Sequence, residues 1–232
     1  MRIGIMQPYL FPYLGYFQLI KAVDTFVIYD DVNYITQGWI NRNRILFKGK
    51  DHMFTLSLSK ASPNKSINKT EIFNDRNNKS GLFELIRQAY LKAPYFKKIA
   101  PLIERLIKYE EINLGKYLEH SIRTIAGHLG MDTNIILSSQ IEKDVSLKKQ
   151  YKLIDIAKNL GADEMVNPIG GLKLYNKVDF SDNNIDLYFL KTDTVPYKQF
   201  DNEFIPDLSI IDIMMFNSNE EINILLDEYQ LI

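Results

Sequence analysis

The first 32 residues constrain the fold more than any other part of the chain. Residues 2–6 (RIGIM) form a short apolar run that ends at a Gln-Pro pair, and residues 14–23 place apolar side chains at helical spacing. Residues 25–32 (TFVIYDDV) are rich in β-branched and aromatic residues, as in a strand. A strand, a helix and a strand so close together make a βαβ unit with parallel strands. We therefore expect an α/β protein with a mostly parallel sheet flanked by helices, a Rossmann-like layout.

The rest of the chain returns to this alternation after a different middle section. Two strand-like runs around a Gly-containing turn predict a hairpin at about 43–58, and helical periodicity occurs three times between about 79 and 129. Strand and helix patterns then alternate again, and the last two patterns are helical. The alternating segments are 133–139, 147–162 closed by Gly161, 163–168, 185–191, 208–217 and 219–229. We expect a single α/β domain over 1–232 with a helical subdomain at about 79–129.

Composition excludes several classes of protein and site. The 232 residues include no cysteine, which excludes a disulfide framework, a thiolate zinc site and a cysteine nucleophile. The three histidines are dispersed, so no metal site is expected. A net charge of −1 gives no field that would attract nucleic acid or an anionic membrane. No apolar run approaches the roughly 20 residues that span a bilayer. We expect a cytoplasmic protein without nucleic-acid binding or membrane insertion.

A rigid aromatic segment, MQPYLFPYLGYFQLI (residues 6–20), connects the first strand to the first helix. Open α/β sheets bind ligands beyond the carboxyl ends of their strands, and Gln7 directly follows this strand. Pro8 and Pro12 fix backbone angles, so that the aromatic rings can offer a preformed stacking surface. The alternative is that the rings simply cover the sheet. The rings concerned belong to Tyr9, Phe11, Tyr13 and Tyr16.

The second strand ends at a pair of carboxylates, Asp30 and Asp31, which are candidates for a general base. The following segment, VNYITQGWINRNR, combines amides and guanidinium groups suited to a sugar and a phosphate. Its candidate ligand-binding residues are Trp39, Arg42, Asn43 and Arg44. Alternatively, the charged residues form a surface ion pair of little energetic value and Trp39 belongs to the core.

Two later segments supply weaker candidates. In NPIGGLKLY (167–175), Gly170 and Gly171 permit close approach of a ligand and Lys173 can meet an anion, although a turn with positive φ explains the glycines equally well. In FIPDLSIIDIMMFN (204–217), Ser209 and Asp212 have the spacing of a capping box, which accounts for Ser209 better than a catalytic role does. A hydrolase built on Ser209 and His52 would require these distant residues to converge.

Taken together, these segments resemble the WbqC-like protein family over nearly the full length. The resemblance rests on MQPYLFPYLGYFQLI, DTFVIYDDVNYITQGWINRNRI, KAPYF, LGAD followed by NPIGG and LY, and FIPDLSIIDIMMFN, in this order. It implies an enzyme-like protein from bacterial surface polysaccharide gene clusters, including O-antigen clusters. The positions that match the family pattern are Gln7, Pro8, Tyr13, Gly15, Asp30, Asp31, Arg42, Asn43, Tyr197, Ser209, Asp212 and Asn217.

The activity that the resemblance implies is transfer of an acyl or aminoacyl group to a nucleotide-linked amino sugar. The donor would be an acyl carrier, either coenzyme A or a carrier protein. In this hypothesis Asp30 or Asp31 is the base, Arg42 and Arg44 hold a phosphate, and Gln7 and Asn43 orient the sugar. The alternative is a non-catalytic nucleotide-sugar binding or assembly protein.

The layout of strand, proline-rich loop, YLGY and helix is also similar to nucleotidyltransferases of the HUP class. Those proteins carry H-x-G-H at this point, where this chain has Tyr13 and Tyr16. The similarity implies that nucleotide binding is retained, whereas adenylylation chemistry is in doubt.

Overall fold

A six-stranded sheet with the order β10-β9-β8-β1-β2-β7 lies at the centre of the computed structural model, which describes residues 1–73 and 75–232. All neighbouring strands are parallel except β10, which is antiparallel to β9. The strands are β1 (Arg2–Met6), β2 (Thr25–Ile28), β7 (Asn134–Leu137), β8 (Glu164–Pro168), β9 (Asp186–Thr192) and β10 (Tyr229–Leu231). The predicted mostly parallel, Rossmann-like sheet is confirmed.

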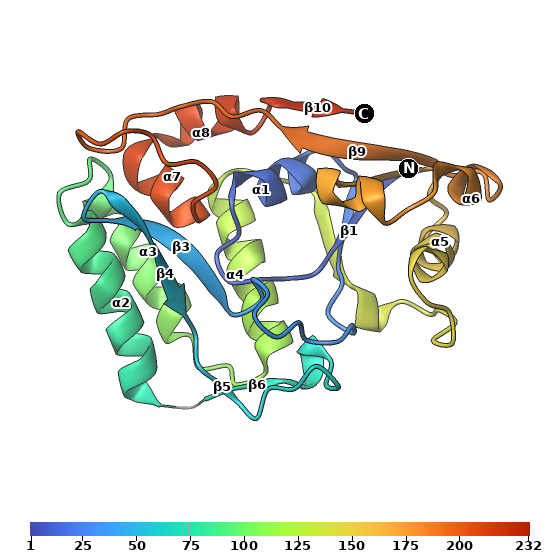
Figure 1. The fold of residues 1–232 in the computed structure, drawn as a ribbon, viewed down its shortest axis with the longest axis horizontal. Helices are drawn as coiled ribbons and strands as arrows, with labels where there is room; N and C mark the ends of the chain where they lie inside the picture. Colours follow the sequence, from blue (N-terminus) through green and yellow to red (C-terminus); the bar gives the residue numbers. More distant parts are fainter. Residues whose placement is uncertain (74) are drawn as a thin grey trace.

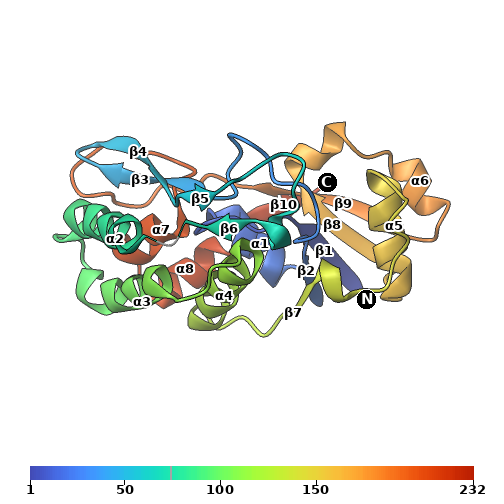
Figure 2. The same ribbon diagram turned by 90° about the horizontal axis from the view of Figure 1, so that it is seen from below.

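Helices cover both faces of this sheet (Figures 1 and 2). Side chains of β1 alternate between the faces: Ile3 and Ile5 pack with one set of helices, whereas the backbone of Gly4 lies against Leu19 and Phe26 on the other face. Burial on both faces explains why β1 and β2 are apolar almost throughout. One set comprises α5 (Gln150–Asn159) and α6 (Lys177–Ser181). The other includes α1 (Leu14–Lys21), α4 (Leu114–His128), α7 (Ile210–Phe216) and α8 (Asn219–Leu225).

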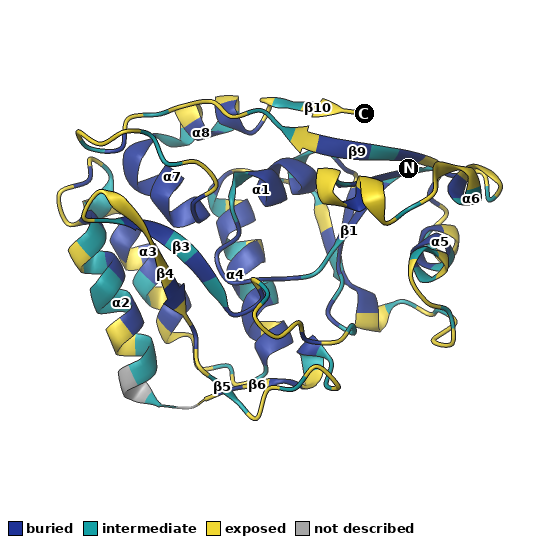
Figure 3. Ribbon diagram, in the orientation of Figure 1, coloured by how far each residue is buried: buried dark blue, intermediate teal, exposed yellow. Residues whose placement is uncertain are grey.

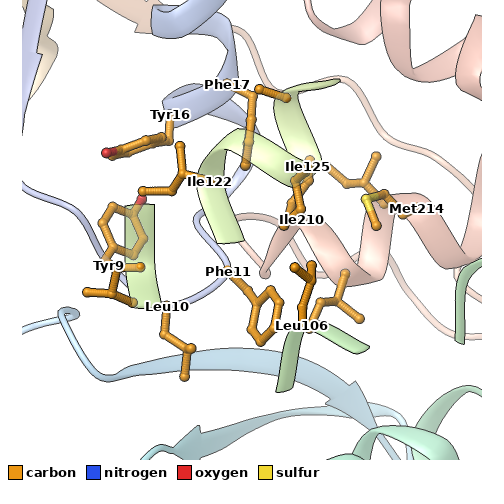
Figure 4. Packing of buried hydrophobic residues seen from close by; sticks show 14 of the residues in the cluster. Tyr9, Leu10, Phe11, Tyr16, Phe17, Leu106, Ile122, Ile125, Ile210 and Met214 are labelled. Atoms are coloured by element: carbon orange, nitrogen blue, oxygen red, sulfur yellow. The ribbon is translucent and has the colours of Figure 1, made fainter. Parts of the chain in front are cut away.

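The middle of the chain forms the predicted hairpin and the three predicted helices. The hairpin consists of β3 (Arg42–Phe47) and β4 (Lys50–Thr55), and the other two helices are α2 (Arg76–Tyr90) and α3 (Phe96–Lys108). These elements lie beside α7 (Figure 1), and their inward sides are buried whereas β4 is largely exposed (Figure 3). One hydrophobic cluster joins them to the sheet: Leu106 of α3, Ile122 of α4 and Met214 of α7 pack near Phe11 (Figure 4).

Some short elements were not predicted from the sequence. The segment 219–229 was expected to be helical throughout, but α8 ends at Leu225 and Tyr229 pairs with Thr192 in β10. The second strand was expected to extend to residue 32, but β2 ends at Ile28. The remaining elements are β5 (Leu58–Ser59), β6 (Glu71–Ile72) and the 3-10 helices η1 (Ile67–Lys69), η2 (Ser138–Gln140) and η3 (Ile169–Lys173).

The connections diverge between β1 and β8. From β1 the chain builds β2 and β7 to one side, and it then returns to place β8 and β9 on the other side. Because α1, which follows β1, and α6, which follows β8, lie on opposite faces of the sheet, the loops after β1 and β8 part and leave a crevice at the carboxyl ends of these strands. This position is the one in which open α/β sheets usually bind ligands.

Candidate functional site

A cavity of about 850 Å³ lies at this divergence point. Its walls come from the ends of β1 and β8, the segments that follow β1 and β2, strand β3, the 3-10 helix η3, Leu153 of α5 and Asp207. The volume is within the range of roughly 300–1,000 Å³ that small-molecule and cofactor sites occupy. The structure brings the following predicted ligand-binding residues into this cavity: Gln7, Tyr9, Tyr13, Trp39, Asn43, Arg44, Gly170 and Gly171.

The aromatic loop after β1 contributes both to the cavity and to the core. Phe11 and Tyr16 are fully buried and pack in the hydrophobic cluster, which also includes Tyr9 (Figure 4). Tyr9 and Tyr13 line the cavity. Phe11 has a φ of +44°, which is strained for an aromatic residue. Phe11 and Tyr16 thus cover the sheet and Tyr13 lines the cavity, whereas Tyr9 does both.

Hydrogen bonds from distant segments fix this strained loop. The Asn43 amide donates to the carbonyl oxygens of Leu10 at 3.0 Å and of Phe11 at 2.7 Å. The Ser209 hydroxyl also donates to the Phe11 carbonyl, at 2.8 Å. Asn43 and Ser209 thus hold the loop in shape from β3 and from the start of α7, because these donors satisfy buried carbonyl groups.

Tyr13 covers the beginning of α1. A Cβ at Gly15 would lie 2.5 Å from Cζ of Tyr13, and the Tyr13 hydroxyl is hydrogen-bonded to the side chain of Thr192. In Rossmann-like proteins the backbone amides at this helix N-terminus usually hold a phosphate. In this protein a phenol ring lies close to that position, and Gly15 makes room for it.

The two predicted phosphate-binding arginines have different surroundings. Arg42 donates through Nε to the Gly38 carbonyl at 2.8 Å and also bonds the Gln37 carbonyl, so it holds the turn that carries Trp39 and does not line the cavity. Arg44 does line the cavity, with its guanidinium carbon 5.5 Å from the centroid of the Trp39 ring. Trp39 is 46% exposed, so a ligand ring can reach it.

Two amide side chains project from the ends of the central strands. Gln7 follows β1, and Asn167 lies in β8, whose register places Val166 opposite Gly4. Asn167 is buried at the cavity wall, and its amide nitrogen lies 3.6 Å from the sulfur of Met165. Sequence reasoning missed Asn167, although the rule that identified Gln7, a polar residue at a strand's carboxyl end, applies equally to it.

Asp30 lies outside the cavity lining and is 2% exposed. Its Oδ1 accepts from the backbone amide of Ser139 at 2.9 Å, and its Oδ2 accepts from the Ser139 hydroxyl at 2.7 Å. Asn68 also donates to Oδ2, at 3.2 Å. The Ser139 bonds join the end of β2 to η2, which follows β7, and the Asn68 bond joins it to η1. The predicted role of Asp30 as a base stays a prediction.

Asp31 also lies outside the cavity lining, next to two lysines. Burial acts to raise the pKa of Asp31, but hydrogen bonds from Lys143 and Ser138 and the charges of Lys143 and Lys152 outweigh it and hold the pKa below its ordinary value. A carboxylate whose pKa is lowered binds a proton weakly, which is unfavourable for a general base at neutral pH.

Asp212 lies in a buried network away from the cavity. Tyr90 and Tyr197 donate to its two carboxylate oxygens, each at 2.6 Å, and Gln199 donates to Oδ2 at 2.8 Å. Burial raises the pKa of Asp212, and the three hydrogen bonds lower it by less. Ser209 does cap α7, but the predicted capping box with Asp212 is wrong, because the carboxylate turns into this network instead.

Among the remaining candidate residues, only Gly170 and Gly171 line the cavity. Gly170 and Gly171 are not among the glycines with positive φ, so the turn explanation is wrong for them. A Cβ at Gly171 would lie 2.9 Å from the Tyr175 ring, whereas one at Gly170 would meet nothing within 4 Å. Lys173 is exposed outside the lining, and the Asn217 amide donates to the Ile213 carbonyl at 2.9 Å. Tyr197, Ser209, Asp212 and Asn217 are therefore not in the cavity.

The predicted hydrolase pair is not assembled in the described residues. The Ser209 hydroxyl is buried and donates to the Phe11 carbonyl. His52 lies on the exposed strand β4, with its ring 5.4 Å from that of Phe47. Within residues 1–73 and 75–232 no group of three or more His, Cys, Asp or Glu side chains is arranged to hold a metal ion. Over the same ranges no helix has the length and apolar character needed to cross a membrane.

The strand order and the cavity define an α/β protein of Rossmann-like layout with a ligand-sized hollow at the divergence of its central strands. The chain belongs to the WbqC-like protein family, whose model matches residues 7–224. It is similar to the uncharacterized protein Rv1507c of Mycobacterium tuberculosis, with 26% identity over 223 residues that cover 95% of each chain. No significant match was found among solved structures.

Proposed function

We propose that the protein is a transferase of bacterial surface polysaccharide biosynthesis that binds a nucleotide-linked amino sugar in this cavity. In this proposal the protein works in the cytoplasm and transfers an acyl or aminoacyl group, supplied by coenzyme A or a carrier protein. Membership of the WbqC-like family supports the biosynthetic context. The single observation that carries the binding role is the cavity itself, which combines ring surfaces with a few polar groups at the usual ligand position of the fold.

The lining residues suit the parts of such a ligand. Trp39 is an exposed ring on which a base or sugar can stack, and Arg44 beside it can meet a phosphate. Gln7 and Asn167 offer amide donors and acceptors for sugar hydroxyls. The Asn43 amide already donates to two backbone carbonyls, so its support for ligand binding comes through the loop that it holds.

A thermal-shift screen against nucleotide sugars, nucleotides and acyl carriers tests the proposal. A ligand that binds only the native protein stabilises it by about 2.7 kcal/mol at one hundred times its Kd, which raises the Tm by several degrees. The shift should shrink in Gln7→Leu and Trp39→Ala, and it should persist in Gln230→Leu, because Gln230 is exposed on β10. Absence of any shift with nucleotide sugars would overturn the binding role.

A second candidate function is non-catalytic binding of the nucleotide-linked sugar. The observation that favours it is that Asp30 and Asp31 lie outside the cavity lining with their carboxylates already hydrogen-bonded. Replacing each by Asn and following polysaccharide production in cells distinguishes the two functions. Loss of production in a variant that remains folded and still binds the sugar supports a catalytic carboxylate, whereas normal production in both variants supports the binding protein.

A further inference from the structure

The cavity wall carries one guanidinium group and one carboxylate group among the described residues, those of Arg44 and Asp207. Sequence reasoning did not identify Asp207, which precedes the buried pair Leu208 and Ser209 at the start of α7. A wall with one charge of each sign suits a ligand that also carries one charge of each sign, because each ligand charge then gains a partner on leaving water.

Backbone contacts hold Asp207 next to Arg44. The Ser209 amide donates to the Arg44 carbonyl at 2.9 Å, and the Arg44 guanidinium donates to the Asp207 carbonyl at 3.5 Å. Asp207 has a φ of +56°, a conformation that Asp tolerates better than most residues. The two residues therefore reach the cavity from adjacent points on its rim.

The Asp207 carboxylate is available to a ligand. It is exposed, and the structure gives it no hydrogen bond or ion pair from any residue within 1–73 or 75–232. The charge of this carboxylate acts on Tyr13, which lines the cavity. Burial raises the pKa of Tyr13, and the negative charge of Asp207 also acts to raise it. Tyr13 therefore stays neutral, and Asp207 is the anionic group on this side of the cavity.

Arg44 is the group of the cavity wall that can bind an anionic part of the ligand. One of its terminal nitrogens lies 3.2 Å from Asp51, and its buried Nε has no hydrogen-bond partner among the described residues. At the other usual phosphate position, the N-terminus of α1, the Tyr13 ring packs against Gly15, the second residue of the helix. A phosphate that enters the cavity thus meets Arg44 rather than helix amides.

We infer that Asp207 binds the amino group of the ligand while Arg44 binds its phosphate, so that the cavity selects a phosphorylated sugar with a free amine. This inference rests on the proposed function and specifies its substrate class. An N-acetylated sugar has lost the positive charge that Asp207 would meet, and a sugar with a hydroxyl at that position never had it. The acceptor would therefore be bound before its amine is acylated.

Isothermal titration with three probes tests the selection: glucosamine 1-phosphate, N-acetylglucosamine 1-phosphate and glucose 1-phosphate. The ammonium group gains a charged partner at Asp207 that the other two probes cannot use, so wild-type protein should bind glucosamine 1-phosphate about tenfold more tightly than the other two. Asp207→Asn should abolish this preference, since Asn also tolerates positive φ and the fold should be kept. Arg44→Gln should weaken all three probes by about tenfold and leave the preference intact.

Asp201→Asn is the matched control, because Asp201 is an exposed acid of the same loop that does not line the cavity. This variant should keep the amine preference. If none of the probes binds wild-type protein while nucleotide sugars still raise its Tm, this inference is overturned and the proposed function is kept. If nucleotide sugars also leave the Tm unchanged, both are overturned. If the probes bind but with equal affinity, or if Asp207→Asn retains the preference, only the inference is overturned. Unfolding curves of each variant establish that the fold is unchanged.

Discussion

The Asn43 side-chain amide donates a hydrogen bond to the main-chain carbonyl oxygen of Phe11 at 2.7 Å. The bond joins strand β3 to the loop after β1 across 32 residues of sequence, and Ser209 reaches the same carbonyl from the start of α7. Three segments that resemble the family pattern thus meet at one peptide group. Asn43 and Ser209 support the cavity wall through the backbone, whereas Tyr9 and Tyr13 form its surface.

Replacing Asn43 with Ala should destabilise the protein and loosen the cavity wall. The variant leaves the buried carbonyl of Leu10 without this donor and removes one of two donors to Phe11, which should cost about 1–3 kcal/mol. Urea unfolding measures the loss. Asn33→Ala, at an exposed position, is the control and should change the unfolding free energy by less than about 0.5 kcal/mol. An equal effect of both substitutions would contradict this account of the loop.

Replacing two helical glycines, Gly15 and Gly127, with alanine should change the stability of the protein in opposite directions. A Cβ at Gly15 would lie 2.5 Å from Tyr13 and closer still to Oγ1 of Thr192, so Gly15→Ala must displace both side chains and should cost about 1–3 kcal/mol. A Cβ at Gly127 in α4 would meet nothing within 4 Å, so Gly127→Ala should stabilise the protein by about 1 kcal/mol through helix propensity. Thermal unfolding of both variants checks the sign of each change. If Gly15→Ala stabilises the protein, the Tyr13 ring does not need the space that the missing Cβ of Gly15 leaves.

The fold was predictable where it follows from local periodicity. The alternation of β1, α1 and β2 is visible in the order of apolar side chains, and the three helices of the insert are amphipathic. Strand β10 was not predictable, since three residues give too short a pattern and their pairing depends on Thr192 and its neighbours in β9. The pairing of β1 with β8, which creates the divergence point, likewise depends on contacts between residues far apart in sequence.

The site was predictable only in part, for a geometric reason. Gln7 and the glycines of η3 follow the two strands that flank the divergence point, so the rule about carboxyl ends of strands selected residues that line the cavity. Asp30 and Asp31 follow β2, which pairs with β7 on its other side, and their carboxylates turn toward Ser138 and Ser139 after β7. Asp207 was missed because a positive φ in an irregular loop leaves no periodic signal.

Replacing Gly170 with Val and replacing Gly171 with Val should have very different effects on stability. Gly170 lines the cavity and its Cβ has open space, so Gly170→Val should leave stability within about 1 kcal/mol while narrowing the cavity. Gly171→Val should cost about 1–3 kcal/mol or more, because its Cβ would lie 2.9 Å from Tyr175 and 3.2 Å from Phe189. Ligand titration together with chemical unfolding separates the two effects. Unchanged ligand binding in Gly170→Val would place the ligand elsewhere in the cavity.

Replacing Asp30 with Asn should lower the free energy of unfolding, independently of any role of Asp30 in the chemistry. The carboxylate accepts from both the amide and the hydroxyl of Ser139, and an Asn side chain has one acceptor oxygen in place of two. We expect a loss of about 1–3 kcal/mol in the free energy of unfolding. Ser139→Ala removes one of the same bonds and should cost roughly 1 kcal/mol. If Asp30→Asn is as stable as the wild type yet inactive, a catalytic role for Asp30 is favoured instead.

The stability of the protein should fall on acidification in a way that depends on Asp31. Its pKa in the folded protein lies below the ordinary value of 3.8, so the unfolded chain binds a proton at higher pH than the folded protein does. The stabilisation from this carboxylate is therefore fully present above the unfolded pKa and is lost as pH falls through the folded pKa. In Asp31→Asn this pH-dependent contribution is absent.

Chemical unfolding at a series of pH values from about 6 to about 2.5 measures the effect. The difference in unfolding free energy between wild type and Asp31→Asn should be constant at the upper end and should shrink below about pH 4. In Lys143→Met the free energy of unfolding should fall less on acidification than it does in the wild type. The reason is that Lys143 donates to Asp31 at 2.9 Å and opposes the effect of burial on its pKa. A difference that stays constant down to the lowest pH would mean that the pair of Lys143 and Asp31 does not stabilise the charged carboxylate in the folded protein.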